Sequence, residues 1–130
     1  MSVNTAKDLT VYGKSYELAM AVFNLTLQFP PEEKYALTSQ IRRSSRSVCL
    51  ILREAWAKRR YEAHFISKLT DCDGENSETG FLDFAWDCNY LSIDQHRVLS
   101  ELNREVGRML GSMLNNPKPF LTQSDKKERP

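Results

Sequence analysis

The residues best suited to chemistry in this sequence are arginines that recur along one stretch of the chain. At about 100° per residue, four of them fall within an arc of about 40° on one face of a helix: Arg42, Arg46, Arg53 and Arg60. A guanidinium group presents a planar fork of donors that matches a phosphate, so this row could neutralise several phosphates of a nucleic acid. Trp56 borders the row and could stack on a base or on a neighbouring guanidinium. If the helix persists to Arg60, the row is about 27 Å long.

Charge is distributed unevenly, although the formal net charge of the chain is only +1. Between Lys34 and Arg60 there are eight basic residues and one acidic residue, a formal charge of +7, whereas residues 71–94 hold seven acidic residues and no Lys or Arg. The row could therefore pair with acids of the second segment, within the bundle or across a subunit contact, instead of binding nucleic acid. The candidate acids are Asp71, Glu75 and Glu78. The pI of about 7.7 also argues against strong non-specific binding of nucleic acid, for which a pI above about 9 is usual.

Arg43 points about 100° away from the row on an ideal helix. We expect it to form a structural ion pair with Glu54 or Glu78, because half-buried pairs of arginine and carboxylate serve packing and register more often than chemistry.

No set of residues indicates an enzyme. A di-iron bundle would need Glu-x-x-His motifs, and neither His64 nor His96 has a glutamate three residues before it. The three cysteines form no C-x-x-C pair, and there is no glycine-rich phosphate loop. We therefore expect a non-enzymatic protein with no catalytic residue, no metal and no cofactor.

The elements that must position these residues are predicted to be four helices. The first covers about Val11–Phe29 and ends at two prolines, and the second continues to about Ala57. The third is predicted over about Tyr61–Tyr90, with weak helix propensity in its middle. The fourth follows a capping box, Ser92 to Gln95, and stops at Asn115-Asn116-Pro117. Four helices with short connections pack most simply as an antiparallel up-down-up-down four-helix bundle, an all-α fold.

Apolar spacing predicts which residues form the core. On the first helix these are Tyr12, Tyr16, Ala19, Met20, Phe23 and Leu27, and on the second Leu37, Ile41, Ser44, Val48, Ile51, Leu52 and Ala55. On the third they are Phe65, Leu69, Cys72, Leu82 and Trp86, and on the fourth Val98, Leu102, Val106, Met109, Leu110 and Met113. One core cannot bury all the aromatic residues late in the third helix, so part of that set should meet another subunit or lie under a turn: Phe81, Phe84, Trp86 and Tyr90.

Length and composition predict one domain, residues 1–121, followed by a disordered polar tail, 122–130. An odd number of cysteines without paired spacing and no secretory segment favour the cytoplasm. No apolar run approaches the roughly 20 residues of a membrane span, so we expect no membrane contact.

The residues from the end of the first predicted helix into the second match the sequence pattern of a known family. Phe29-Pro30 is followed by Glu33, by Tyr35-Ala36-Leu37 and by Gln40-Ile41-Arg42-Arg43-Ser44-Ser45. This pattern is similar to that of bacterial four-helix-bundle proteins related to those encoded in intervening sequences of 23S ribosomal RNA genes. The similarity covers about residues 9–114. It departs from the family where N-I-A-E-G is replaced by Ile51-Leu52-Arg53-Glu54-Ala55, which keeps the glutamate and loses Asn and Gly.

The resemblance implies an up-down bundle that assembles as a homo-oligomeric ring, a pentamer, and whose relatives include nucleic-acid-binding accessory proteins of diversity-generating retroelements. Our favoured interpretation is a non-enzymatic homo-oligomer whose arginine row binds structured RNA or DNA. The alternative is a structural or protein-adaptor bundle in which the same arginines contact other subunits or a partner protein.

Overall fold

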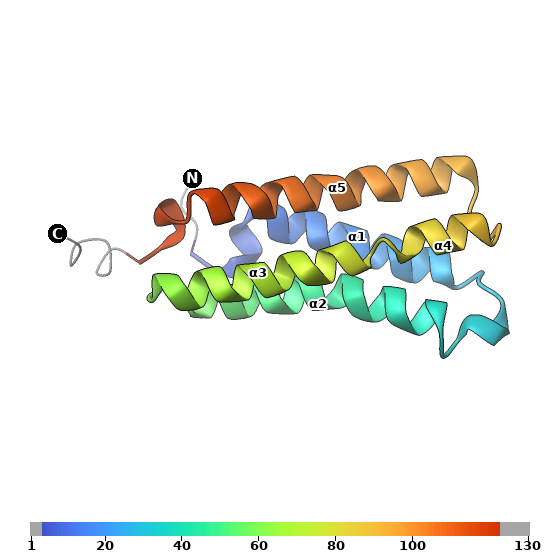
Figure 1. The fold of residues 1–130 in the computed structure, drawn as a ribbon, viewed down its shortest axis with the longest axis horizontal. Helices are drawn as coiled ribbons and strands as arrows, with labels where there is room; N and C mark the ends of the chain where they lie inside the picture. The colour runs from blue at the N-terminus through green and yellow to red at the C-terminus, as the bar shows by residue number, and fades with distance from the viewer. Residues whose placement is uncertain (1–3, 123–130) are drawn as a thin grey trace.

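The computed structural model describes residues 4–122. These residues are helical, with no strand among them, and they form four antiparallel arms packed side by side (Figure 1). The helices are α1 (Thr10–Thr26), α2 (Leu37–Ala57), α3 (Glu62–Glu78), α4 (Phe81–Asp87) and α5 (Ile93–Asn115), with short 3-10 turns at Ala6–Asp8, Pro31–Glu33 and Lys118–Phe120. Helices α1 and α3 each pack against both α2 and α5, so the arms form a square in cross-section. The predicted all-α, up-down-up-down four-helix bundle is confirmed.

The ends of the helices follow from local chemistry. Helix α1 ends at Thr26, three residues before the predicted end, and the Thr26 hydroxyl donates back to the carbonyl of Val22 (2.8 Å). The two prolines that follow prevent the helix from continuing. At the start of α5, the Ser92 hydroxyl accepts from the amide of Gln95 (3.1 Å), and Gln95 Oε1 accepts from the amide of Ser92 (2.8 Å). The predicted capping box is therefore present.

The third arm is not one helix, which corrects the prediction of a continuous helix from Tyr61 to Tyr90. Helix α3 ends at Glu78, and α4 begins at Phe81 after a turn at Thr79 and Gly80. A Cβ on Gly80 would lie 3.0 Å from the carbonyl oxygen of Ser77, so the turn is tight enough to favour glycine. The chain then leaves α4 through Asn89, whose φ of 63° is the left-handed conformation typical of a residue that ends a helix.

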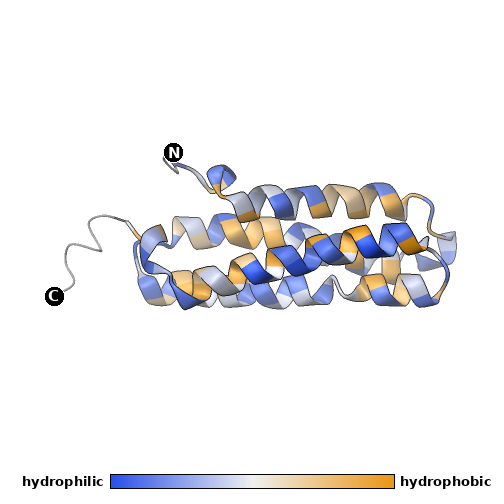
Figure 2. Ribbon diagram, turned by 90° about the horizontal axis from the view of Figure 1, so that it is seen from above, coloured by the Kyte–Doolittle hydropathy of each residue, from blue (hydrophilic) through white to orange (hydrophobic). Residues whose placement is uncertain are grey.

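The core consists of two clusters, one toward each end of the bundle. The cluster nearest the first and last described residues joins the start of α1 to α3 and the ends of α2 and α5, and the other joins the end of α1 to α4 and the starts of α2 and α5. Hydrophobic and hydrophilic residues alternate along the helices in Figure 2, as expected for amphipathic helices that share a core. The core predicted for α2 is confirmed, except that Ile51 is only half-buried.

On α1 the predicted core face is largely wrong. Tyr12 and Ala19 are buried and Phe23 is half-buried, but Tyr16, Met20 and Leu27 are exposed by 54%, 44% and 65%. A neighbouring face of the helix is buried in the core instead, and it consists of Val11, Ser15, Leu18, Val22, Leu25 and Thr26. The hydroxyl of Ser15 donates to the carbonyl of Val11 (2.7 Å), so its burial leaves no donor unsatisfied.

Two further core predictions need correction. Trp86 is 37% exposed and its ring stacks on His96, with 5.4 Å between centroids. On α5, Val98 is exposed and its neighbour Leu99 is buried in its place. The remaining predicted core residues of α3 and α4 are buried, and those of α5 are buried or half-buried. Part of the late aromatic set does lie outside the core, as predicted, since Phe84 and Trp86 are both exposed.

Within residues 4–122, no helix has the length and apolar character needed to cross a membrane. The polar tail predicted for residues 122–130 lies, after Thr122, outside the described residues.

Candidate nucleic-acid interface

The arginine row lies on the outer side of α2. Arg46 and Arg53 are exposed and Arg42 is half-buried. Arg60 lies beyond the end of α2 at Ala57, in the turn that leads to α3. The helical part of the row therefore extends from Arg42 to Arg53, about 17 Å at 1.5 Å per residue, and not the full length predicted. Arg60 is exposed, and its guanidinium lies 5.8 Å from the centre of the Tyr61 ring.

The first two arginines of the row are supported by α1. The guanidinium carbons of Arg42 and Arg46 lie 5.0 and 5.7 Å from the centre of the Phe23 ring. Arg42 Nε also donates to the hydroxyl of Thr26 (2.7 Å). This contact fixes the side chain, while the outer amino groups of Arg42 have no partner in the described part of the chain. A guanidinium held in this way has already lost much of the side-chain freedom that binding an anion would otherwise cost.

A shallow groove of about 530 Å³ runs along the first half of α2 beside these arginines. Its lining includes Lys34, Tyr35, Thr38, Arg42, Arg46 and Leu50, and no carboxylate lines it. Among residues 4–122, Tyr35 is the most exposed large hydrophobic residue, at 86%. The Lys34 ammonium lies 5.4 Å from the centre of its ring. The groove thus combines several cations with one accessible aromatic ring.

Trp56 does not belong to this surface, which corrects its assignment as a stacking residue for a base. It is only 9% exposed and belongs to the core. The guanidinium of Arg59 lies 3.9 Å from the centre of its ring, and Arg59 Nη1 donates to the Trp56 carbonyl (3.0 Å). Of the two stacking partners predicted for Trp56, the structure contains the guanidinium.

The acids of α3 pair with Arg43, which lies outside the row. Arg43 donates to Glu78 through Nη2 and to Glu75 through Nη1 (3.0 Å), and these contacts, Glu78 first, raise the pKa of the guanidinium. The predicted pair of Arg43 and Glu78 is therefore confirmed. Glu54, the alternative partner, pairs instead with Lys68 of α3 (3.0 Å).

Because Arg43 holds Glu75 and Glu78, these acids do not neutralise the row. Neither Arg46 nor Arg53 forms an ion pair with any residue in 4–122. The row consequently presents positive charge that no carboxylate of residues 4–122 neutralises through an ion pair.

Residues 7–112 match the family described as 23S rRNA-intervening sequence protein. The chain belongs to this family. A similar solved structure is that of a protein of unknown function from the S23 ribosomal protein family of Bacteroides thetaiotaomicron. It has 29% sequence identity and a TM-score of 0.73, and the alignment covers 81% of this chain and 98% of that one. The comparison with curated proteins gives no match.

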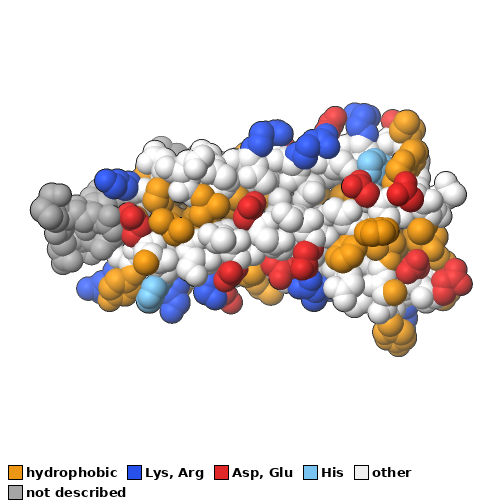
Figure 3. All heavy atoms as spheres, viewed as in Figure 1, with side chains coloured by type: hydrophobic (Ala, Val, Ile, Leu, Met, Phe, Trp, Pro, Cys, Tyr) orange, Lys and Arg blue, Asp and Glu red, His pale blue; other side chains and the backbone are white. Residues whose placement is uncertain are grey.

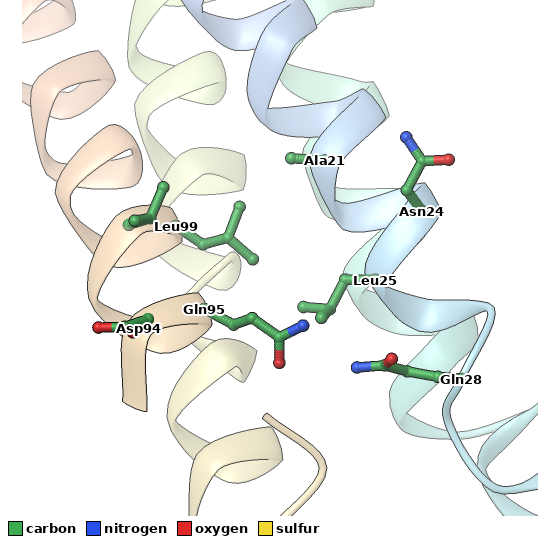
Figure 4. A pocket seen from close by; sticks show the side chains of 8 residues that line it. Ala21, Asn24, Leu25, Gln28, Asp94, Gln95 and Leu99 are labelled. Carbon is green, nitrogen blue, oxygen red and sulfur yellow. The ribbon is translucent and has the colours of Figure 1, made fainter. Parts of the chain in front are cut away.

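In this member of the 23S rRNA-intervening sequence family, other surfaces fit phosphates less well. A cavity of about 460 Å³ lies between the end of α1 and the start of α5. Figure 4 shows the side chains of Gln28 and Gln95 extending toward each other beside Leu25 and Leu99. Its polar lining is uncharged apart from Asp94, and Gln95 Oε1 is already used to cap α5. An acidic or neutral lining does not attract a polyanion.

No group of three or more His, Cys, Asp or Glu side chains in residues 4–122 is arranged to hold a metal ion. On the face in Figure 3, hydrophobic side chains gather over the end of the molecule that carries α4. That end includes the exposed side chains of Phe84, Trp86 and Ile93. This apolar surface differs from the α2 groove in chemistry and suits contact with protein better than with phosphate.

Two residues of the groove, Lys34 and Tyr35, were not predicted from the sequence. Tyr35 lies in the turn before α2, which begins at Leu37, so the helical period that aligned the arginines gave no signal for it. Phe23, which supports two of the arginines, was assigned to the core of the bundle.

Proposed function

We propose that this protein is a non-enzymatic, homo-oligomeric four-helix bundle that binds structured RNA or DNA through the outer side of α2. The observation that carries the proposal is the groove along the start of α2, whose lining contains four basic side chains and an exposed tyrosine but no carboxylate. Arg43 is the one basic side chain of the lining that is already paired with acids, and Arg42 and Arg46 form no ion pair with residues 4–122. Phosphate contacts supply most of the sequence-independent affinity for nucleic acid, and guanidinium groups are the side chains best matched to them.

The positions of the acids support this proposal. Glu75 and Glu78 pair with Arg43, so the charge of Arg46 and Arg53 remains available to a polyanion. The near-neutral net charge of the chain fits a local binding surface better than a protein that is cationic all over. Nucleic acid and free cysteines both fit a cytoplasmic location, which we include in the proposal.

We further propose that the bundle assembles as a ring, with a pentamer as the expected form. Two exposed apolar surfaces support assembly, one on α1 at Tyr16, Met20 and Leu27, and one at Phe84 and Trp86 of α4. Contact between two different surfaces of identical subunits is heterologous and gives a ring when the rotation closes. Such a ring would repeat the arginine row around the assembly and so raise its avidity for a long polyanion.

The test is a charge-reversal variant, Arg46→Glu with Arg53→Glu, measured by fluorescence anisotropy with a labelled RNA hairpin at several salt concentrations. The wild type should bind, and its affinity should fall steeply as the salt concentration rises. For each phosphate that the protein neutralises, a tenfold rise in salt should lower the association constant about tenfold. The double variant should lose binding while its helicity and its elution volume stay unchanged.

The matched control is Arg104→Glu with Arg108→Glu, two exposed arginines on α5 that make the same change in net charge. This control should retain at least about a third of the wild-type affinity, because long-range attraction alone depends weakly on position at physiological salt. Equal losses in both variants would contradict a specific surface on α2.

A second function is favoured by one observation, the exposed apolar stripe of α1 that adjoins the arginines. Phe23 belongs to the same side of α1 as Tyr16, Met20 and Leu27 and lies beneath Arg42 and Arg46. Arginines beside aromatic and apolar residues are typical of protein interfaces. In this case the bundle is a structural or adaptor protein, and the row contacts a subunit or a partner protein. The same double variant would then elute as a smaller species, and the wild type would not bind RNA at any salt.

A further inference from the structure

We infer that the groove at the start of α2 binds a nucleotide whose base is unpaired. The base stacks on Tyr35, and the adjacent phosphate lies against Arg42 and Arg46. This inference rests on the proposed function and names the class of nucleic acid that the surface takes, which is a single-stranded segment such as an RNA loop and not a continuous duplex.

Tyr35 is positioned for this role by the turn that precedes α2. The amide of Ala36 donates to the carbonyl of Glu33 (3.0 Å), and the amide of Gln40 donates to the carbonyl of Ala36 (3.0 Å), so the backbone on the helix side of the ring is held by hydrogen bonds. The side chain itself belongs to neither core cluster and is 86% exposed. Packing therefore gives no reason for an aromatic residue at this position, whereas a stacking partner would.

The cations lie on the same groove as the ring. Lys34 contacts the Tyr35 ring, and Arg42 and Arg46 follow along the helix within the lining of the groove. Thr26 and Phe23 hold Arg42, which reduces the ordering that phosphate binding requires. Leu50, also in the lining and 61% exposed, provides an apolar surface toward the far end of the groove. A ring and an apolar residue with cations between them match the alternation of base and phosphate along a single strand.

The preference for unpaired bases follows from the geometry of stacking. The faces of bases inside a duplex are covered by the neighbouring base pairs, so a protein ring cannot reach them. A duplex could use the guanidinium groups of the row but would leave Tyr35 without a partner. A loop or single strand can use both, and stacking adds about fivefold or more in affinity per base.

The experiment compares three labelled RNAs of equal length by fluorescence anisotropy: an unstructured single strand, a hairpin with a long loop and a blunt duplex. They are measured against the wild type, Tyr35→Ala and Tyr35→Phe. The matched control is Tyr61→Ala, which removes another exposed tyrosine next to a cation, at the opposite end of α2 and outside the groove. Elution volume and helicity are recorded for every variant.

The wild type should prefer the single strand and the loop over the duplex. Tyr35→Ala should weaken binding of the single strand about tenfold and leave duplex binding within about twofold, while Tyr35→Phe keeps the stacking face and stays near the wild type. The inference is overturned if Tyr35→Ala leaves single-strand affinity unchanged, if it weakens the duplex equally, or if Tyr61→Ala causes the same loss. In each of these outcomes the wild type still binds RNA, so the proposed function survives. If the wild type binds none of the three RNAs, the proposed function itself fails and Tyr35 becomes a candidate contact for protein.

Discussion

Asn76 and Asn103 bind each other's backbone across the bundle. Asn76 Nδ2 donates to the carbonyl of Asn103 (3.1 Å), and Asn103 Nδ2 donates to the carbonyl of Asn76 (3.0 Å) and to its side-chain oxygen (2.9 Å). Asn76 is buried, and a Cβ on Gly107 would lie 3.3 Å from its amide nitrogen, so the glycine gives this amide room. The pair fixes α3 to α5 just before the turn that separates α3 from α4.

Replacement of Asn76 by alanine should lower the free energy of unfolding by about 2 kcal/mol, because a buried amide is removed and its partners at Asn103 lose their bonds. Urea unfolding followed by circular dichroism measures the change. Ser77→Ala, an exposed neighbour on the same turn, should change the free energy by less than about 0.5 kcal/mol. A similar small change for Asn76→Ala would show that the pair does not stabilise the fold.

Thr79, in the turn between α3 and α4, is fully buried, and its hydroxyl has no hydrogen-bond partner in the described part of the chain. Replacement by valine keeps the shape and removes the unsatisfied group, so Thr79→Val should raise the free energy of unfolding by about 1 kcal/mol. Thr79→Ser is the control, because it keeps the hydroxyl, loses the methyl group and should be destabilising. A loss of stability in the valine variant would mean that the hydroxyl has a partner, such as a water molecule, in solution.

The break between α3 and α4 shows which features of the fold the sequence could predict and which it could not. Proline, the capping box and the apolar spacing of α2 and α5 are local signals, and they located most helix ends correctly. The turn at Gly80 had only a weak signal, the low helix propensity in the middle of the third predicted helix, because a glycine inside a helical pattern is often tolerated, as Gly74 is within α3. After the turn, Leu82 and Ala85 of α4 pack into the core cluster that contains the end of α1 and the starts of α2 and α5. These contacts are between residues far apart in the sequence, so local propensity could not predict them.

The face of α1 was mispredicted for a different reason. This helix is apolar around most of its circumference, so two neighbouring stripes have similar spacing. Ser15 and Thr26 made the true core face look polar, although their hydroxyls bond to the helix itself. The prediction of the candidate interface was limited in the same way, because the sequence does not show how neighbouring helices pack. The positions of the arginines followed from the period of the helix, but the partners of Arg42 and Arg43 on α1 and α3 depended on how the helices pack.

The three cysteines should differ sharply in reactivity. Cys49 and Cys72 are buried, and burial raises the pKa of Cys49 to about 11 and that of Cys72 to about 12, whereas Cys88 is exposed. Because the thiolate is the reactive form, Ellman's reagent at pH 8 should label one thiol per native chain and three after unfolding. The Cys88→Ser variant should show no rapid labelling. Rapid labelling of a second thiol would indicate that the cluster around Cys72 opens readily.

Tyr90 ties the end of the third arm to the connection between α1 and α2. Its hydroxyl donates to Glu33 Oε2 (2.9 Å), and its ring lies 5.3 Å from that of Phe29. The hydrogen bond to Glu33, which an ionised tyrosine could not donate, is the main reason that the pKa of Tyr90 rises to about 12 from the ordinary value of 10.0. This bond holds α4 and its exposed aromatic residues in position at one end of the bundle.

The raised pKa predicts how stability depends on pH. A tyrosine that holds its proton more tightly in the folded state contributes stability that is complete below its unfolded pKa, near 10, and is lost as the pH rises through its folded pKa, near 12. The difference in unfolding free energy between the wild type and Tyr90→Phe should therefore be constant up to pH 10 and shrink between pH 10 and 12. Urea titrations at matched pH measure it, and the comparison cancels the titration of the other tyrosines and the lysines. In a Glu33→Gln background the same comparison should lose most of its pH dependence, because the carboxylate that raises the pKa is gone. A difference that stays constant to pH 12 in the wild-type background would show that the bond to Glu33 is not formed in solution.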